Sequence, residues 1–339
     1  MRRRGFAGVA ALVLTSAGLT ALAVAAPAAA CACGAPTPPE GVRVSVGQEQ
    51  ALVTFDGSTE RIDLVLDMLA DGAETGLVLP TPSPATVSLG DRELFDALDR
   101  QTEPEVEVRQ DWWGTGGDGA AGGASPTVLS EVDLGPVQAV TLAASDAEGL
   151  RDWLDANGYG IASGVQALLG DYVDRGWSFA ALKLTGEQTI DGQLDPIRFE
   201  FATDAAVYPL LLSQASASPQ TVRLYLVGDE RMAVAFPDGA ELPGDVTWAG
   251  AVDEPALAEL GPYLTVVEAY FFDPATQITG DLDIRSTGGR EDYAPVTDRT
   301  EYVQLGGVPL GLVLLVVGLI LAGMFTFVAV TARARTRRR

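Results

Sequence analysis

The sequence predicts an α+β protein: a sheet-rich extracytoplasmic domain with about three amphipathic helices, plus one C-terminal transmembrane helix. Three observations lead to this class. The 339-residue chain has an apolar run near each end. Between them lie many short runs rich in Val, Leu, Phe and Tyr, which are typical of strands. Only three segments have the periodicity of a helix that packs on one face.

The first thirty residues have the pattern of a secretory signal. Arg2–Arg4 precede an apolar run over residues 6–24, and small residues then lead to Cys31. A basic start, an apolar middle and a small-residue end form the three parts of such a signal. We therefore predict that residues 1–30 are a signal peptide that is removed on export.

The other apolar run predicts a membrane anchor. Val308–Val330 carries no charge, and as a helix it is about 34 Å long at roughly 1.5 Å per residue, enough to cross a hydrocarbon core of about 30 Å. Arginines cluster in the tail that follows, residues 331–339, and should stay in the cytoplasm by the positive-inside bias. The sequence thus predicts a single-pass protein of the cell membrane whose N-terminal domain is extracytoplasmic.

The body between these ends, residues 31–286, should be dominated by sheet. Its apolar runs are short and rich in branched and aromatic side chains. The predicted strands are Val42–Val46, Ala51–Phe55, Ile62–Leu69, Val128–Val132, Val137–Leu142, Phe179–Leu184, Ile197–Phe201, Val222–Val227, Met232–Phe236 and Tyr263–Phe272.

Each predicted helix has a start or stop signal. Asp91 can cap a helix that turns Leu94, Phe95 and Leu98 inward. Apolar residues of a later helix recur at helical spacing over Val165–Val173, with Gly176 placed as its terminator.

A further helix over residues 146–156 lies between these two. Ser145 and Glu148 have the spacing of a capping box, and Asn157-Gly158 offers a left-handed stop.

Two segments are predicted to lack regular structure. Gly114–Gly119 does not continue into the Gly-Lys-Ser/Thr of a phosphate-binding loop, and Lys183 lies far away, so a surface loop is expected. Residues 287–307 mix Gly, Asp, Arg and Thr with little periodicity and are predicted to form a stalk that holds the body off the membrane.

Charge excludes one class of partner. Without the eight terminal arginines, 14 basic residues remain in the body against 46 acidic ones, a net charge of about −32. Phosphate neutralisation needs clustered Lys and Arg, so nucleic acid is not expected as a partner. The predicted partners are the membrane, through the single span, and a protein or small ligand outside the cell. The acidity itself is expected to serve solubility.

Histidine is absent from the whole chain. This excludes Ser-His-Asp and Cys-His catalysis and histidine-based zinc sites. The carboxylates at Asp281 and Asp283, and at Asp191 and Asp195, do not follow a calcium-loop pattern and are expected at solvated strand ends. We therefore predict no catalytic residue, no cofactor and no metal site, and a protein that is not an enzyme.

Cys31 and Cys33 are the only cysteines. An exported pair is usually oxidised, so a structural disulfide or a simple tether is the favoured interpretation. A Cys-x-Cys ring is small and strained, which leaves a reducible redox pair or a metal-binding dithiol as an alternative. Lipidation of Cys31 after cleavage is the third, although Ala28–Ala30 suits ordinary signal peptidase better.

Aromatic clusters were weighed as ligand platforms. Trp112-Trp113 and Trp177 can stack on ligands, but packing in the core is the expected use. Tyr270–Phe272 is expected in a strand that is buried on both faces.

Several segments together resemble domain-of-unknown-function family 2330, whose members are exported bacterial proteins that are often membrane-anchored. The resemblance implies location and domain extent and no known activity. It rests on Cys31–Gly34, Val78–Pro82, Leu94–Asp99 with Thr102, Trp153–Tyr159, Tyr172–Trp177, Lys183-Leu184, Val207–Leu210 and Val222–Tyr225.

The function predicted from these observations is a non-catalytic ligand- or partner-binding module at the bacterial cell surface. The alternative is an extracytoplasmic thiol redox or metal-handling protein that uses Cys31 and Cys33. A hydrolase built from carboxylates that the sequence does not single out ranks third.

Overall fold

The computed structural model describes residues 34–39, 41–113, 138–144, 146–185 and 189–336. The predicted signal peptide, Cys31 and Cys33, the glycine-rich segment and the predicted strand Val128–Val132 all lie outside these residues. The described body is α+β and rich in strands, as predicted, and a long apolar helix ends the described chain.

Three sheets form the body. The four-stranded sheet has the order β1 (Ala35–Thr37), β4 (Glu74–Thr81), β8 (Ser178–Thr185), β7 (Gln138–Ala143). The eight-stranded sheet has the order β14 (Gly244–Ala251), β15 (Tyr263–Phe271), β12 (Gln220–Gly228), β2 (Val44–Phe55), β3 (Thr59–Ala70), β10 (Ile197–Ala202), β5 (Thr86–Leu89), and β9 (Ile190–Gln193) also pairs with β3. The three-stranded sheet consists of β11 (Val207–Tyr208), β16 (Leu282–Ser286) and β13 (Met232–Ala235).

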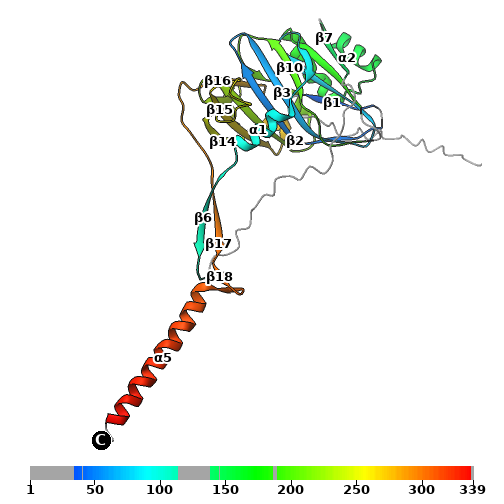
Figure 1. The fold of residues 1–339 in the computed structure, drawn as a ribbon. Coiled ribbons are helices and arrows are strands. Elements are labelled where there is room, and N and C mark those ends of the chain that lie inside the picture. Colours follow the sequence, from blue (N-terminus) through cyan, green and yellow to red (C-terminus); the bar gives the residue numbers. More distant parts are fainter. Residues whose placement is uncertain (1–33, 40, 114–137, 145, 186–188, 337–339) are drawn as a thin grey trace, which may run out of the picture.

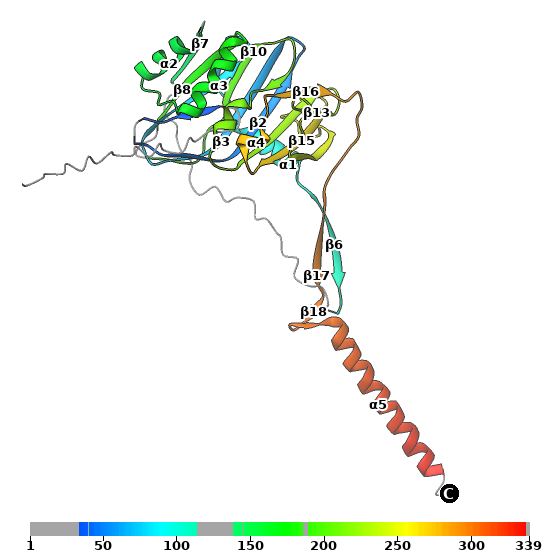
Figure 2. The same ribbon diagram turned by 180° about the vertical axis from the view of Figure 1, so that it is seen from behind.

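Helices cover the outer faces of these sheets. α2 (Ala147–Ala156) and α3 (Ser163–Asp174) pack on the four-stranded sheet, and α1 (Arg92–Gln101) packs on the eight-stranded sheet (Figure 2). Two short turns of helix, η1 (Leu211–Ala215) and α4 (Pro274–Gln277), contact each other. The body is therefore a layered sandwich of helices, sheet, sheet and helix.

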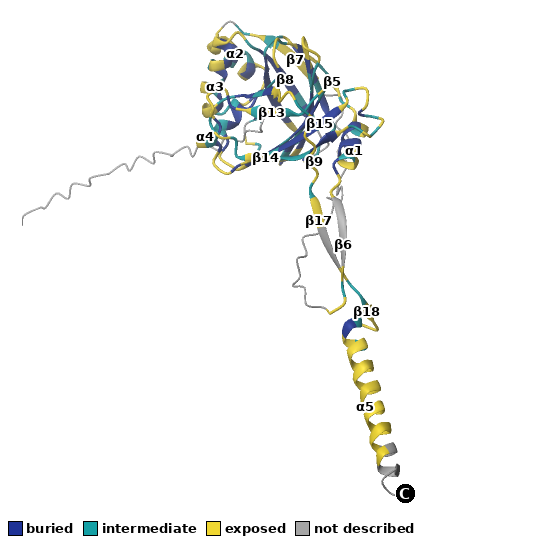
Figure 3. Cartoon of the chain, turned by 90° about the vertical axis from the view of Figure 1, so that its left-hand side faces the viewer, coloured by how far each residue is buried: buried dark blue, intermediate teal, exposed yellow. Residues whose placement is uncertain are grey.

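The largest apolar core lies between the sheets. Ile62 and Leu64 of β3 pack there with Leu79 of β4, Leu182 of β8 and Ile284 of β16. A second cluster joins the four-stranded sheet to α2 and α3, and a third joins the eight-stranded sheet to α1. The central strands are buried on both faces (Figure 3), which explains why their sequences are nearly continuous apolar runs.

The residues of the turn between β2 and β3 explain why these two central strands form a hairpin. The carboxylate of Asp56 accepts hydrogen bonds from the amides of Ser58 (2.9 Å) and Thr59 (2.8 Å), and Gly57 has a φ of 97°. The Thr59 amide is the main reason that the pKa of Asp56 is lowered. The two runs predicted at Val42–Val46 and Ala51–Phe55 belong to one strand, β2, because its register shifts between Val46 and Glu49 and breaks the pattern.

The predicted helix cap at Asp91 and the terminator at Gly176 are confirmed. The Asp91 carboxylate accepts from the Glu93 amide at 2.9 Å, and Leu94, Phe95 and Leu98 are buried. Past the end of α3, Gly176 has a φ of 74°. The predicted cap of α2 is wrong: Asp146 caps it by accepting from the Gly149 amide at 2.6 Å, because Asp146, rather than Ser145, directly precedes the first helical residue.

Buried carboxyl groups fix the short strand β11 against the large sheet. Glu49 of β2 and Glu60 of β3 are both buried. The Tyr208 hydroxyl donates to Glu49, and the Val207 amide donates to Glu60 at 3.1 Å. These contacts hold two consecutive residues of the three-stranded sheet to the central strands of the eight-stranded sheet.

Asp281 holds the next part of the same segment. Its Oδ1 accepts from the Leu210 amide (2.9 Å), the Leu211 amide (3.0 Å) and the Tyr172 hydroxyl. Its Oδ2 accepts from Arg175 at 2.8 Å. The expectation of a solvated carboxylate at Asp281 is therefore wrong, because the side chain fills the junction of α3, η1 and β16.

The body stands on a two-stranded ribbon. β6 (Glu105–Asp111) and β17 (Val296–Tyr302) pair in parallel, and a small hairpin of β18 (Gln304–Leu305) and β19 (Val308–Pro309) leads into α5 (Leu310–Thr336). Figure 1 shows the ribbon between the body and α5. The sequence analysis did not predict strands in the stalk, and the last helix begins two residues after the predicted Val308 because that residue pairs in the hairpin.

The Asp281 contacts give a stability prediction. Asp281→Ala leaves the Leu210 and Leu211 amides without their acceptor, and each buried donor left unsatisfied costs about 1–3 kcal/mol. We expect the free energy of unfolding to fall by roughly 3 kcal/mol, measured by urea denaturation of the full chain in detergent. Asp283→Ala is the matched control, because its ion pair with Arg285 is largely exposed; equal losses in both variants would contradict the role of Asp281.

Candidate functional site

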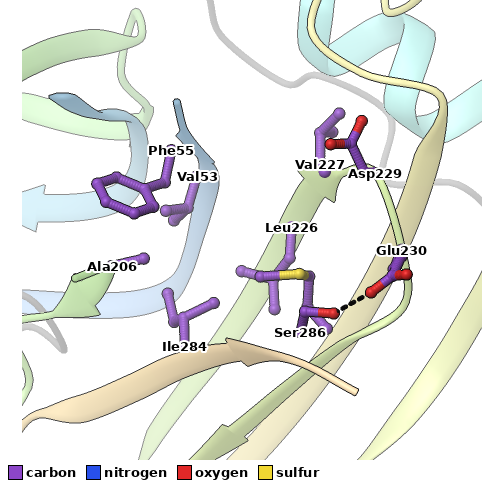
Figure 4. Close-up of a pocket in the computed structure, with 11 residues that line it drawn as sticks. Val53, Phe55, Ala206, Leu226, Val227, Asp229, Glu230, Ile284 and Ser286 are labelled. Carbon is purple, nitrogen blue, oxygen red and sulfur yellow. Dashed lines mark hydrogen bonds between the residues drawn. The ribbon is translucent and has the colours of Figure 1, made fainter. Parts of the chain in front are cut away.

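The eight-stranded and three-stranded sheets separate at one end to form a pocket of about 390 Å³. Figure 4 shows this inter-sheet pocket between strand ends of the two sheets. Its lining residues are Val53, Phe55, Ala206, Leu226, Val227, Gly228, Asp229, Glu230, Met232, Ile284 and Ser286.

The floor of the pocket is apolar. Val53 of β2 and Leu226 of β12 are register partners in the one parallel pair of the eight-stranded sheet, so their side chains project from the same face. Ile284 of β16 approaches from the other sheet, and all three are buried. Phe55 and Met232 complete the wall and are half-buried.

The charged residues of the pocket lie at its rim. β12 ends at Gly228, and the chain turns through Asp229 and Glu230 before β13 begins. Glu230 accepts a hydrogen bond from the Ser286 hydroxyl (Figure 4). Within the described part of the chain, neither Asp229 nor Glu230 forms a salt bridge. An apolar floor therefore lies beneath a negatively charged rim.

A strap of residues 287–293 supports this rim. The Thr287 amide donates to the Arg231 carbonyl and the Arg231 amide donates to the Gly289 carbonyl, both at 2.9 Å. The Arg290 side chain donates to the Asp229 carbonyl at 2.7 Å. The same strap continues into β17, so the pocket mouth and the ribbon are joined by a short length of chain.

Glu60 lies behind the pocket wall. It is the register partner of Phe55, and it accepts from Val207, the residue after the lining Ala206. Burial raises the pKa of Glu60 to about 8 and outweighs the opposite effect of the Val207 amide. The group is therefore mainly protonated at neutral pH, and perturbed carboxyls of this kind gather at functional sites.

A second, more open cavity of about 610 Å³ lies beside α3. The Arg175 guanidinium in this cavity already has partners within the protein. It pairs with Asp281 and lies 4.2 Å and 4.6 Å from the ring centroids of Tyr172 and Trp177. Because these groups hold one another, the inter-sheet pocket is the better ligand site.

Three of the carboxylates that the sequence analysis singled out pair with different arginines, Asp281 with Arg175 as described above. Asp195 pairs with Arg92 and Asp283 pairs with Arg285, each at 2.5 Å. Among the described residues, no three His, Cys, Asp or Glu side chains lie close enough to hold a metal ion. Cys31 and Cys33 lie outside those residues, so their disulfide, redox, metal and lipidation alternatives stay predictions.

Two aromatic predictions are wrong. Trp112 and Trp113 are exposed because β6 leaves the body before them. Tyr270 and Phe272 are also exposed, and only Phe271 between them is buried. The α1 cluster covers the β15 residues Leu264 and Val266, and the outer face of the strand is open beyond them. Trp177 is half-buried, with its ring 5.0 Å from that of Tyr172.

Sequence reasoning found the strands of the pocket but missed its charged residues. Val53, Leu226 and Met232 fall in predicted strands, whereas Asp229 and Glu230 lie between two predicted strands and no role was predicted for them. One signal was available: Glu60 starts the long apolar run of β3, where a carboxyl group has to be buried with the rest of the strand.

The fold and the pocket define an acidic α+β body joined by a strand ribbon to one apolar helix. The model of a family described as "Uncharacterized protein conserved in bacteria (DUF2330)" matches residues 27–285, and the chain belongs to this family. The resemblance noted in the sequence is thereby confirmed.

Comparison with characterised proteins adds little. No curated protein matches the chain. A solved structure similar to it is baculovirus P35, at 7% identity and a TM-score of 0.30, covering 71% of this chain and 94% of that one. This likeness is too distant to define the fold.

The buried Glu60 gives a pH prediction. Its pKa is about 8 in the folded state against an ordinary value of 4.5. Between these values the folded protein keeps a proton that the unfolded chain has released, so wild-type stability falls as pH rises through this window and levels off above it. Glu60→Gln removes this loss.

The measurement is urea denaturation of both proteins between pH 5 and pH 8.5. Relative to wild type, Glu60→Gln should gain stability on the order of a few kcal/mol across the window, at about 1.4 kcal/mol per unit of pKa shift. Glu200→Gln, on an exposed side chain of β10, is the control. Parallel pH profiles for wild type and Glu60→Gln would show that Glu60 is not protonated in the folded state.

Proposed function

We propose that this protein is a single-pass membrane protein whose acidic, non-catalytic body binds a ligand outside the cytoplasm. We further propose that the ligand is a small amphipathic cation, with an apolar part in the inter-sheet pocket and an ammonium group at its rim. The observation that carries this proposal is the apolar floor beneath Asp229 and Glu230.

The anchor is supported by α5. Within the described residues it is the one helix long and apolar enough to cross a membrane, over Leu310–Val330, and apart from Gly311 at its start no residue of that stretch is buried. Figure 3 shows α5 mostly exposed beyond its buried first turn. The arginines beyond it, beginning at Arg333, favour a cytoplasmic C-terminus, which places the body on the other side.

The ligand class follows from the chemistry of the pocket. Burial of apolar surface supplies affinity, and ligand pockets of about 300–1,000 Å³ hold small molecules. A cation at the rim gains attraction from two carboxylates that have no ion-pair partner among the described residues. The chain's net charge of −24 also draws cations toward the body from a distance.

The composition of the chain and the groups that line the pocket support a binding role over a catalytic one. The chain has no histidine to act as a general base. The rim hydroxyl of Ser286 is bonded to Glu230 at the surface of the protein, and the floor beneath it is apolar. These groups can orient and hold a cation but form no recognisable nucleophile and base.

The proposal is tested with benzylammonium, benzyl alcohol and benzoate, which share a ring and differ in charge. Binding to the full chain in lipid nanodiscs, followed by ligand-observed NMR, should rank the cation first and the anion last. Ala206→Leu should abolish binding of all three, because Ala206 is a buried lining residue and the added atoms occupy the pocket.

The rim makes a separate contribution. Asp229→Asn with Glu230→Gln should weaken benzylammonium binding about ten-fold, equivalent to about 1.4 kcal/mol, and leave benzyl alcohol unchanged. Glu259→Gln, an exposed acid outside the pocket lining, is the matched control. Equal binding of the three probes, or a cation affinity that the rim variant does not change, would contradict the proposed ligand class.

A further inference from the structure

The end of the ribbon is bonded directly to the start of α5. The Val303 amide donates to the Asp111 carbonyl at 3.0 Å, and the Leu310 amide donates to the Val303 carbonyl at 2.8 Å. The Gly311 amide donates to the Trp112 carbonyl at 2.7 Å. The residues that follow β6 are therefore held at the first turn of the helix, as the arrangement in Figure 1 shows.

Trp113 is fixed at the same level. Its amide donates to the Asp111 carboxylate at 2.8 Å. Its ring lies against the helix backbone, because a Cβ atom added to Gly311 would be only 2.7 Å from the ring atom Cδ2. Glycine at position 311 thus permits the indole to pack on the helix start, although 53% of Trp113 and 44% of Trp112 remain exposed.

The β18–β19 hairpin adds apolar surface beside them. Gly306 and Gly307 have φ angles of 62° and 82°, as a tight type I′ turn requires. On either side of this turn, Leu305 is 61% exposed and Val308 is 44% exposed. Trp112, Trp113, Leu305 and Val308 therefore form a collar of exposed apolar side chains around the beginning of α5.

We infer that this collar inserts into the headgroup region of the bilayer that α5 crosses. The inference rests on α5 being a membrane span, as in the proposed function, and is independent of the pocket ligand. The apolar stretch begins at Leu310, so the boundary of the hydrocarbon core falls beside the collar. Tryptophan favours this boundary, because its ring is apolar while its N–H bonds to water or headgroups.

Charge indicates which lipid the collar needs. Glu301 lies exposed near the membrane end of the ribbon, so anionic headgroups would be repelled there. Apolar burial supplies the attraction instead, and a zwitterionic phosphatidylcholine surface is sufficient. Because both the ribbon end and α5 are tied to the collar, insertion holds the body at a set height above the membrane.

Tryptophan fluorescence in phosphatidylcholine nanodiscs tests the inference. The full chain has five tryptophans, and Trp153, Trp177 and Trp248 belong to the body. Lipids brominated near the glycerol end of their chains should quench part of the emission more strongly than lipids brominated near the chain ends. In the Trp112→Phe/Trp113→Phe variant, which keeps an aromatic ring at both positions, this quenching should be lost.

A reference variant separates the collar from the span. Ile320→Trp, added to the double variant, places an indole in the middle of the apolar stretch and should be quenched best by deep bromines. Deep quenching of this reference without shallow quenching of the wild type would overturn the collar and leave the span in place. No quenching of either would overturn both. The double variant should bind benzylammonium as wild type does, which keeps the pocket proposal separate.

Discussion

The arrangement of the body depends on three buried carboxyl groups that hold one five-residue segment, Val207–Leu211. Glu49 and Glu60 reach it from the two central strands of the large sheet, and Asp281 reaches it from the start of β16. A short strand such as β11 has few ladder bonds of its own. The carboxyl groups therefore set how the three-stranded sheet meets the large sheet, and the inter-sheet pocket lies at the end where the two diverge.

Burying a carboxyl group is unfavourable unless its charge is removed or compensated. This protein stabilises its buried carboxyl groups in three different ways. Glu60 is fully buried and keeps its proton, as its raised pKa indicates. Asp63, also buried, lies between Arg61 at 2.5 Å and Arg198 at 2.8 Å, so opposite charges compensate it. Asp281 combines backbone amides with Arg175. The exterior acids need no such partner, because water solvates them.

The ribbon connects the pocket rim to α5 through one continuous piece of chain. Residues 287–293 bond to the pocket rim, and β17 begins three residues later and pairs with β6 down to the first turn of α5. A displacement of the rim would be passed to a strand that ends at the first turn of α5. The pairing with β6, whose chain also comes directly from the body, resists free rotation of the body about its stalk.

The sequence by itself determined the features that depend on neighbours along the chain: the apolar C-terminal helix, the periodicity of α1 and α3, the terminator at Gly176 and most of the central strands. Family membership also followed from local motifs. Tertiary structure alone decided the burial of Asp281, the pairing of β6 with β17, the exposure of Trp112 and Tyr270, and the convergence of pocket residues from four strands. The physical reason is that helix caps and apolar periodicity are set within a few residues, whereas strand pairing and the burial of a polar group depend on partners far away in the sequence.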